Sequence, residues 1–248
     1  MYNHYLIIGG LPECVSSWIQ HKSPERISQI QKDLINLYDG DITKHNSKVN
    51  SGRILLVFRS IVSQLSKGNQ KFIYSNIGKG ARGREYEEAI EWLVSAGIVN
   101  RIHNVLKPEH PLKAFEQLDY FKLYFFDTGL LKQMAGLDNQ AVLLEGNFQF
   151  KGVLAENFVL QQLLESSIST PYFYAVKNSE IDFLIQLGTD IVPIEVKAGE
   201  GKTATSFKNY IKNRHPASAI RILKRNYVTD GEITNLPLYL VNRLRELV

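Results

Sequence analysis

The sequence is poor in cysteine and has no long apolar run. Its single cysteine, Cys14, excludes a disulfide within the chain and a zinc site built from several cysteines. This scarcity is typical of proteins from a reducing compartment. Residues 1–10 lack the basic start and apolar core of a signal peptide, and no stretch reaches the roughly 18 uninterrupted apolar residues of a membrane span. We therefore expect a cytoplasmic protein with no membrane partner.

The charge balance of the chain leans only slightly basic. A length of 248 residues is enough for two ordinary domains or one large one. The 44% of hydrophobic and 22% of charged residues exclude the disordered and fibrous classes of protein. The net charge is +4 and the isoelectric point is about 9.0. These values are compatible with a nucleic-acid partner but do not by themselves indicate one.

Residues 1–50 are expected to form a helical segment. The stretch Gly9-Gly10-Leu11-Pro12-Glu13 is typical of a loop that leads into a helix, here over Cys14–Gln20. A second helix is expected to begin at Pro24, because proline is favoured in the first turn of a helix. Its apolar residues continue to Leu37 at spacings that keep one side of the helix apolar.

Residues 51–145 follow the order of elements of a winged helix and a connector. Apolar residues at helical spacing stop at Gly68, and an amphipathic helix is expected over Arg82–Ala96. A strand beginning at Ile98 and a second near Phe121–Phe126 would flank a polar wing. Helix, turn, helix and a strand pair is the order of a winged helix-turn-helix.

The rest of the chain alternates between helix and strand patterns. Asp127 is expected to cap a short helix by accepting its orphan backbone N–H groups, and residues 139–147 are expected to be a connector. Residues 146–248 indicate an α/β domain, so the chain as a whole is α/β in the broad sense, α+β overall. Its first elements are expected at Gly152–Ser166 (helix), Tyr172–Val176, Glu180–Leu187 and Ile191–Lys197 (strands).

Four charged residues of this domain form the candidate site. Side chains alternate along a strand, so Glu195 and Lys197 share one face. A two-residue turn at Gly188-Thr189 sets Asp182 opposite Glu195, and a four-residue loop gives the same pairing. A three-residue loop instead sends Glu195 to the other face, so the candidate site depends on the parity of the turn.

The residue types suggest metal-assisted chemistry on a phosphodiester. Opposed carboxylates destabilise a strand pair unless a cation meets them, and oxygen ligands suit Mg²⁺ or Mn²⁺. Asp182 and Glu195 would hold the ion, which would polarise a phosphodiester oxygen and activate water. Lys197 could orient the water or offset developing charge. Glu156, on the apolar side of its helix, would complete the site directly or through water. A partly exposed flank or an ordinary salt bridge is the alternative for Glu156.

The motifs in combination resemble the C-terminal region of a bacterial and archaeal family of AAA-type ATPases. In that family a P-loop ATPase precedes a winged helix and a PD-(D/E)XK nuclease-like domain of unsettled role. The resemblance spans nearly the whole chain and implies a restriction-endonuclease-like fold with Glu156, Asp182, Glu195 and Lys197 at its site. The matching stretches are Gly9–Glu13, Gly78–Tyr86, Lys122–Leu131, Lys151–Asn157, Glu180–Leu184 and Ile194–Gly199.

The chain departs from that family in having no recognisable phosphate-binding loop. The stretch Gly199-Glu200-Gly201-Lys202-Thr203 fails the G-x-x-x-x-G-K-[ST] pattern, because Val196 stands where its first glycine belongs. We therefore expect a family member without its ATPase domain, by truncation or by natural reduction.

A second candidate site lies at the start of the presumed recognition helix. Lys79, Arg82 and Arg84 cluster there, where winged helices present cations and backbone N–H groups to DNA phosphates. A solvated turn or a surface that docks an ATPase domain is the alternative. Four acids on the same helix would repel a phosphate backbone: Glu85, Glu87, Glu88 and Glu91. Six further cations are expected mainly on solvated faces rather than beside a cleft: Lys208, Lys212, Arg214, Arg221, Lys224 and Arg225.

Three functions remain open from the sequence. The first is a Mg²⁺- or Mn²⁺-dependent DNA endonuclease that uses the four-residue site. The second is a non-catalytic binding or regulatory module that serves a partner ATPase. The third is a winged-helix transcription factor with a structural C-terminal domain. The intact four-residue set favours the first, because a site relieved of metal chemistry could lose its clustered acids.

Overall fold

The chain forms two compact units. The computed structural model describes residues 2–45, 48–68, 70–144, 150–166, 169–177, 179–199 and 204–247. The first unit comprises Met1–Arg101 and Lys122–Phe150, and the second comprises Ile102–Phe121 and Lys151–Val248. The strands β1 (Val99–Val105) and β2 (Glu116–Phe125) each have residues in both units. The domain boundaries expected near residues 50 and 145 stay predictions.

Helices make up most of the first unit. Pro24 begins the long third helix, and Gly83 and Ser95 bound the amphipathic fifth helix, so the helices predicted there are confirmed. The strands predicted after Ile98 and near Phe121 are also present as β1 and β2. The helices of this unit are α1 (Tyr2–Ile8), α2 (Pro12–His21), α3 (Pro24–His45), α4 (Lys48–Leu65), η1 (Tyr74–Asn76), α5 (Gly83–Ser95), α6 (Thr128–Met134) and α7 (Asn139–Leu143).

The connector expected at residues 139–147 includes a short helix that the sequence analysis did not predict. Residues 139–143 form the short helix α7, where a connector was expected. The Asp138 carboxylate caps this helix by accepting hydrogen bonds from the backbone N–H groups of Gln140 and Ala141, at 2.8 and 3.1 Å. The rest of the expected connector, residues 145–147, lies outside the described residues.

Two sequence motifs meet in the first unit at what we term the glycine–aspartate junction: Gly9, Gly10, Gln31, Asp127 and Gly129. The Asp127 carboxylate accepts hydrogen bonds from Gly10 N at 2.7 Å and, as the predicted helix cap, from Leu130 N at 2.8 Å. Gly9 has φ +73°, and a Cβ at this position would lie 2.3 Å from Asp127 Oδ1. Only a glycine at position 9 is therefore compatible with this approach of the two motifs.

The buried Asp127 carboxylate at the junction is stabilised by hydrogen bonds from backbone N–H groups. Asp127 is 2% exposed, and burial raises the pKa of its carboxyl, while backbone N–H groups of Gly10, Leu130 and Gly129 act in the opposite direction on that pKa. A carboxylate that accepts several backbone N–H groups regains part of the solvation it loses on burial. The junction therefore depends on hydrogen bonds that only close backbone approach can supply.

The second unit is built on a mixed sheet, which confirms the α/β class. The strand order is β2-β1-β3-β4-β5-β6-β8-β7. Strands β3, β4 and β5 are antiparallel neighbours, and β6 and β8 continue the sheet in parallel with β5. Its elements are η2 (Leu112–Phe115), α8 (Lys151–Glu165), β3 (Tyr172–Val176), β4 (Ser179–Leu187), β5 (Asp190–Val196), α9 (Thr205–Arg214), β6 (Ala219–Leu223), β7 (Val228–Asp230), β8 (Ile233–Pro237), η3 (Leu238–Arg243) and α10 (Leu244–Leu247).

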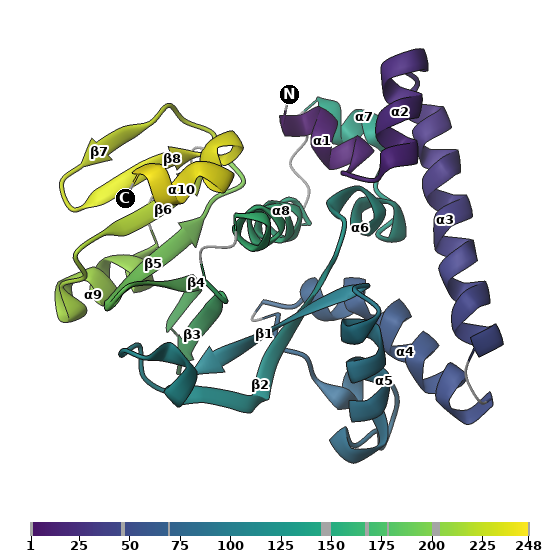
Figure 1. The fold of residues 1–248 in the computed structure, drawn as a ribbon, viewed down its shortest axis with the longest axis horizontal. Helices are drawn as coiled ribbons and strands as arrows, with labels where there is room; N and C mark the ends of the chain where they lie inside the picture. The colour runs from purple at the N-terminus through teal and green to yellow at the C-terminus, as the bar shows by residue number, and fades with distance from the viewer. Residues whose placement is uncertain are drawn as a thin grey trace. The chain divides into compact units, whose positions relative to one another are not determined.

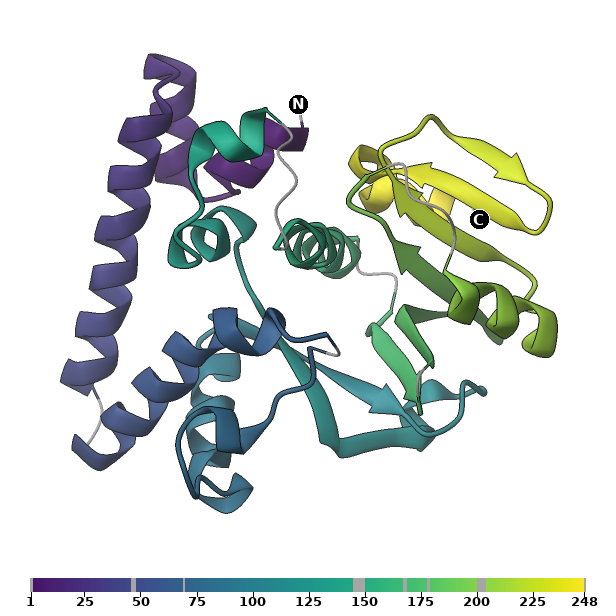
Figure 2. The ribbon, with the colours of Figure 1, turned by 180° about the vertical axis from the view of Figure 1, so that it is seen from behind.

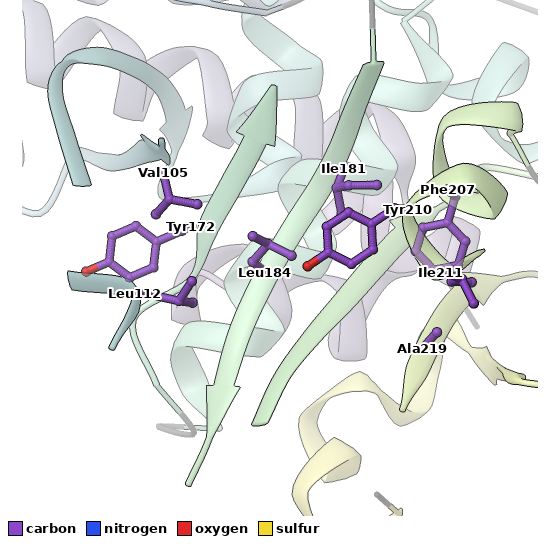
Figure 3. Packing of buried hydrophobic residues seen from close by; sticks show 9 residues of the cluster. All are labelled: Val105, Leu112, Tyr172, Ile181, Leu184, Phe207, Tyr210, Ile211 and Ala219. Carbon is purple, nitrogen blue, oxygen red and sulfur yellow. The ribbon is translucent and has the colours of Figure 1, made fainter. Parts of the chain in front are cut away.

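Helices cover both faces of this sheet. Figures 1 and 2 show α8 and α9 on opposite sides of strands β4 to β6. On the α9 side, Phe207, Tyr210 and Ile211 pack against Leu184 and Ala219 of the strands (Figure 3). Among the described residues, no helix has the length and apolar character needed to cross a membrane. The packing against Ala219 identifies which face of β6 looks toward α9.

Candidate functional site

The predicted hairpin has the turn parity that the candidate site requires. Strands β4 and β5 are joined by Gly188 and Thr189, with Leu187 opposite Asp190 and the register running on to Phe183 opposite Ile194. Of the loop lengths that the sequence left open, the two-residue turn is the one present. Beyond Phe183 the alternation of β4 is interrupted by a β-bulge against β3, since Leu184 and Ile181, three residues apart, belong to the same core cluster. The turn therefore has the required parity, and the pairing of Asp182 with Glu195 stays a prediction.

Glu195 is a buried carboxylate with two donors on one oxygen. It is 3% exposed. Its Oε1 accepts hydrogen bonds from the backbone N–H of Ala204 at 2.8 Å and lies 3.0 Å from Lys197 Nζ. Ala204 is the residue before α9, so the helix start contributes its orphan donor to the acid. The other oxygen, Oε2, is buried and has no hydrogen-bond partner among the described residues.

Asp182 also has a contact with the backbone. Its Oδ2 accepts a hydrogen bond of 2.7 Å from Val196 N. The described ladder pairs of β4 and β5 end at Phe183 and Ile194, so this carboxylate supplies an acceptor to Val196 beyond the last of those pairs. Asp182 and Glu195 therefore each satisfy a backbone donor.

Two further residues lie in register with Glu195: Asn235, which the sequence analysis missed, and Arg221, which it expected on a solvated face rather than beside a cleft. Arg221 lies in register with Glu195 on the neighbouring strand β6, and Asn235 lies in register with Arg221 on β8. Arg221 is 7% exposed and Asn235 is 2% exposed. The expectation of a solvated face is therefore wrong for Arg221. A single arginine between the apolar residues of Ala219–Leu223 was a signal that could have located it.

The side chains of Asn235 and Arg221 are joined. Arg221 Nε donates to Asn235 Oδ1 at 2.7 Å, and Asn235 Nδ2 donates to Val228 O at 3.2 Å. Because Arg221 is two residues beyond Ala219, it faces the α9 side of the sheet. We term Glu195, Arg221 and Asn235 the polar row of the sheet.

Glu156 lies on a helix that covers the side of the sheet opposite to the polar row. It lies in α8, whereas the polar row faces α9, and the two helices cover opposite sides of the strands (Figure 2). Among the described residues, no three Asp, Glu, His or Cys side chains are grouped so as to hold a metal ion. The arrangement of the two helices does not support a contact between Glu156 and the polar row, and the part of Glu156 in the site stays a prediction.

The basic cluster of the first unit lies at the start of α5. Lys79, Arg82 and Arg84 are exposed. Arg82 N donates to Glu85 Oε2 at 3.4 Å, so Glu85 helps to cap the helix. The cluster is thus available to solvent at a helix N-terminus, where anions are favoured.

Two of the acids of α5 are paired within the first unit. The side chain of Arg101 is 9% exposed, and its Nη1 lies 2.7 Å from Glu87 Oε1 and 3.1 Å from Glu91 Oε1. Tyr74 donates its hydroxyl to Glu87 Oε2 at 2.9 Å. Since a buried cation offsets both acids, the repulsion expected between α5 and a phosphate backbone is smaller than the sequence alone implies.

Comparisons with known proteins assign families of undetermined role. Residues 1–141 match the family model described as "Domain of unknown function (DUF8612)". Residues 151–240 match a second model, described as "Domain of unknown function (DUF4143)". No curated protein and no solved structure matches the chain.

Proposed function

The chain belongs to the family described as domain of unknown function (DUF8612), and we propose that its second unit is a divalent-metal-dependent DNA endonuclease module. The observation that carries the proposal is the state of Glu195. Its carboxylate is buried, its Oε1 lies 3.0 Å from Lys197 Nζ, and its Oε2 has no hydrogen-bond partner among the described residues. A buried carboxylate oxygen without a donor is a natural ligand for a cation.

The chain's own residues have distinct parts in this proposal. Asp182 and Glu195, whose carboxylates accept from Val196 N and Ala204 N, would hold Mg²⁺ or Mn²⁺. When bound, the ion would polarise a phosphodiester oxygen and activate water for attack. Lys197, whose side chain is 30% exposed, can reach solvent-borne substrate and offset the charge that develops on a phosphate.

The element order supports the finer fold assignment. The sequence α8, β3, β4, β5, α9, β6 has a helix, an antiparallel hairpin pair and a crossover helix, as in PD-(D/E)XK nucleases. In the first unit, α4, α5, β1 and β2 follow the winged-helix order. DNA contact by Lys79, Arg82 and Arg84 and partnership with an ATPase domain are parts of the same proposal.

The direct test is cleavage of DNA by the purified full chain. With Mg²⁺ or Mn²⁺ we expect nicking or cutting of plasmid, linear or branched DNA, and a loss of about a hundredfold in rate for Lys197→Met. Lys212→Met, a change of an exposed cation on α9, is the matched control and should cut like the wild type. Intact DNA of all three kinds with both metals would count decisively against an endonuclease.

A second candidate function is a non-catalytic binding module. It is supported by the backbone contacts of both acids, because Asp182 satisfies Val196 N and Glu195 satisfies Ala204 N without any metal. Asp182 and Glu195 could therefore serve only to stabilise the fold of the second unit. The winged-helix unit would then carry the function by binding DNA or an ATPase.

The binding module makes its own prediction. Arg82→Ala combined with Arg84→Ala should weaken DNA binding and reduce the salt dependence of its affinity, because phosphate contacts release counterions. Fluorescence anisotropy with a duplex oligonucleotide at two salt concentrations measures both effects. Lys32→Ala combined with Lys44→Ala, changes on α3 with the same loss of charge, serves as the control. If both double variants bind equally well, α5 is not the DNA-binding surface.

A further inference from the structure

The polar row contains a buried cation, Arg221, for which a solvated face was the favoured expectation. Arg221 is the in-register neighbour of Glu195, and adjacent strands lie about 4.8 Å apart. Directly paired residues project from the same face of a sheet. The guanidinium therefore belongs to the same buried layer as the Glu195 carboxylate, although Glu195 Oε2 has no hydrogen-bond donor among the described residues.

Glu195 and Arg221 are both buried, so the charge of each affects the stability of the other's charged form. Glu195 is 3% exposed and Arg221 is 7% exposed. An isolated buried charge is strongly destabilising, whereas opposite charges in the same layer offset each other. Because Asn235 Oδ1 accepts from Arg221 Nε at 2.7 Å and Asn235 itself donates to Val228 O, the guanidinium is fixed in orientation rather than loosely packed.

The charges at the site balance without an added ion. Asp182 and Glu195 bring two negative charges, and Lys197 and Arg221 bring two positive charges. A divalent cation that enters such a set gains little net attraction. A set with one positive charge fewer would be net negative and would attract the cation more strongly, since Coulomb interactions are strong in a poorly solvated layer.

We propose that Arg221, oriented by Asn235, is a second counter-charge of Glu195 beside Lys197 and limits the affinity of the site for divalent metal ions. Arg221 is a positioning residue here, because it acts through Glu195 and not on substrate. The inference rests on the proposed metal site but not on cleavage. It deepens the proposed function by naming a residue whose positive charge opposes metal binding at Glu195.

The experiment measures Mn²⁺ binding to the full chain without DNA, by calorimetric titration. Arg221→Gln should bind Mn²⁺ on the order of tenfold more tightly than the wild type, because the cation is lost while a side chain able to pair with Asn235 remains. Arg221→Lys keeps the charge and should bind as weakly as the wild type. Lys212→Gln changes the net charge of the chain equally at an exposed position of α9, and should have no effect.

The direction of the change separates this role from a structural one. A residue that only stabilises the sheet would lower the metal affinity when replaced, or leave it unchanged. If folded Arg221→Gln binds Mn²⁺ no more tightly than the wild type, Arg221 is not the competitor. The gain should also vanish in Arg221→Gln combined with Glu195→Gln, and a gain that survives would place the metal elsewhere.

A second variant keeps the inference testable if Arg221→Gln does not fold. Asn235→Asp retains an oxygen that can accept from Arg221 Nε but adds a negative charge to the polar row. It should raise Mn²⁺ affinity with Arg221 in place, and unchanged affinity in the folded variant would overturn the inference. Because no DNA is present, a failure to cleave DNA leaves these outcomes unaffected.

Discussion

Gly129→Ala is expected to lower the free energy of unfolding of the first unit by about 3 kcal/mol, the upper end of the usual cost of overpacking. A Cβ at this position would lie 2.6 Å from Gly9 N, 2.8 Å from Gly9 Cα and 2.7 Å from Gln31 Nε2. Gln31 cannot move aside cheaply, because it is fully buried and its Nε2 donates to Ile7 O at 2.7 Å. The new methyl group would therefore force Gly9 away from Asp127.

The measurement can be confined to the first unit. Both tryptophans of the chain, Trp18 and Trp92, lie in that unit, so their fluorescence during urea denaturation reports its unfolding. The matched control is Gly40→Ala in α3, where an added Cβ meets no heavy atom of the described residues within 4 Å. That change should stabilise by up to about 1 kcal/mol, because alanine is the better helix former. Equal stability of Gly129→Ala and the wild type would show that the junction is not closely packed.

Local patterns located most of the elements that carry the site. Pro24 fixed the start of α3, and the two-residue turn at Gly188-Thr189 fixed the register of β4 and β5. Both are short-range signals, since a proline restricts its own turn and a turn length sets strand parity. The sequence therefore reduced the alignment of Asp182 with Glu195 to one question, the parity of the turn, which the structure answers with two residues.

Contacts between distant parts of the chain could not be predicted in this way. The motifs at Gly9 and Gly129 were visible as sequence, but the reason for both glycines is their mutual approach across the junction. The pairing of Arg221 with Asn235 depends on β6 lying beside β8 in a particular register, which no local pattern specifies. The helix α7 was missed for a different reason, because its signal, the cap at Asp138, is local but was not used.

Asp182→Asn is expected to separate the chemical role of the site from its structural one. The asparagine Oδ1 can still accept from Val196 N, so the free energy of unfolding of the second unit should stay within about 1 kcal/mol of the wild type. The negative charge that would hold a metal ion is lost. If the site is catalytic, DNA cleavage with Mg²⁺ or Mn²⁺ should fall by about a hundredfold or more.

Asp182→Ala is the partner variant, because it removes both the charge and the acceptor. Leaving Val196 N without an acceptor should lower the free energy of unfolding by about 1–3 kcal/mol more than Asp182→Asn does. Thermal melting of the full chain, followed by circular dichroism, measures this loss. Glu195→Gln repeats the logic at the second acid, since its oxygen can still accept from Ala204 N. If both amide variants melt and cleave like the wild type, the two carboxylates serve the backbone alone. A catalytic site instead requires that cleavage be lost in variants whose stability is unchanged, and no purely structural role of Asp182 and Glu195 produces that combination.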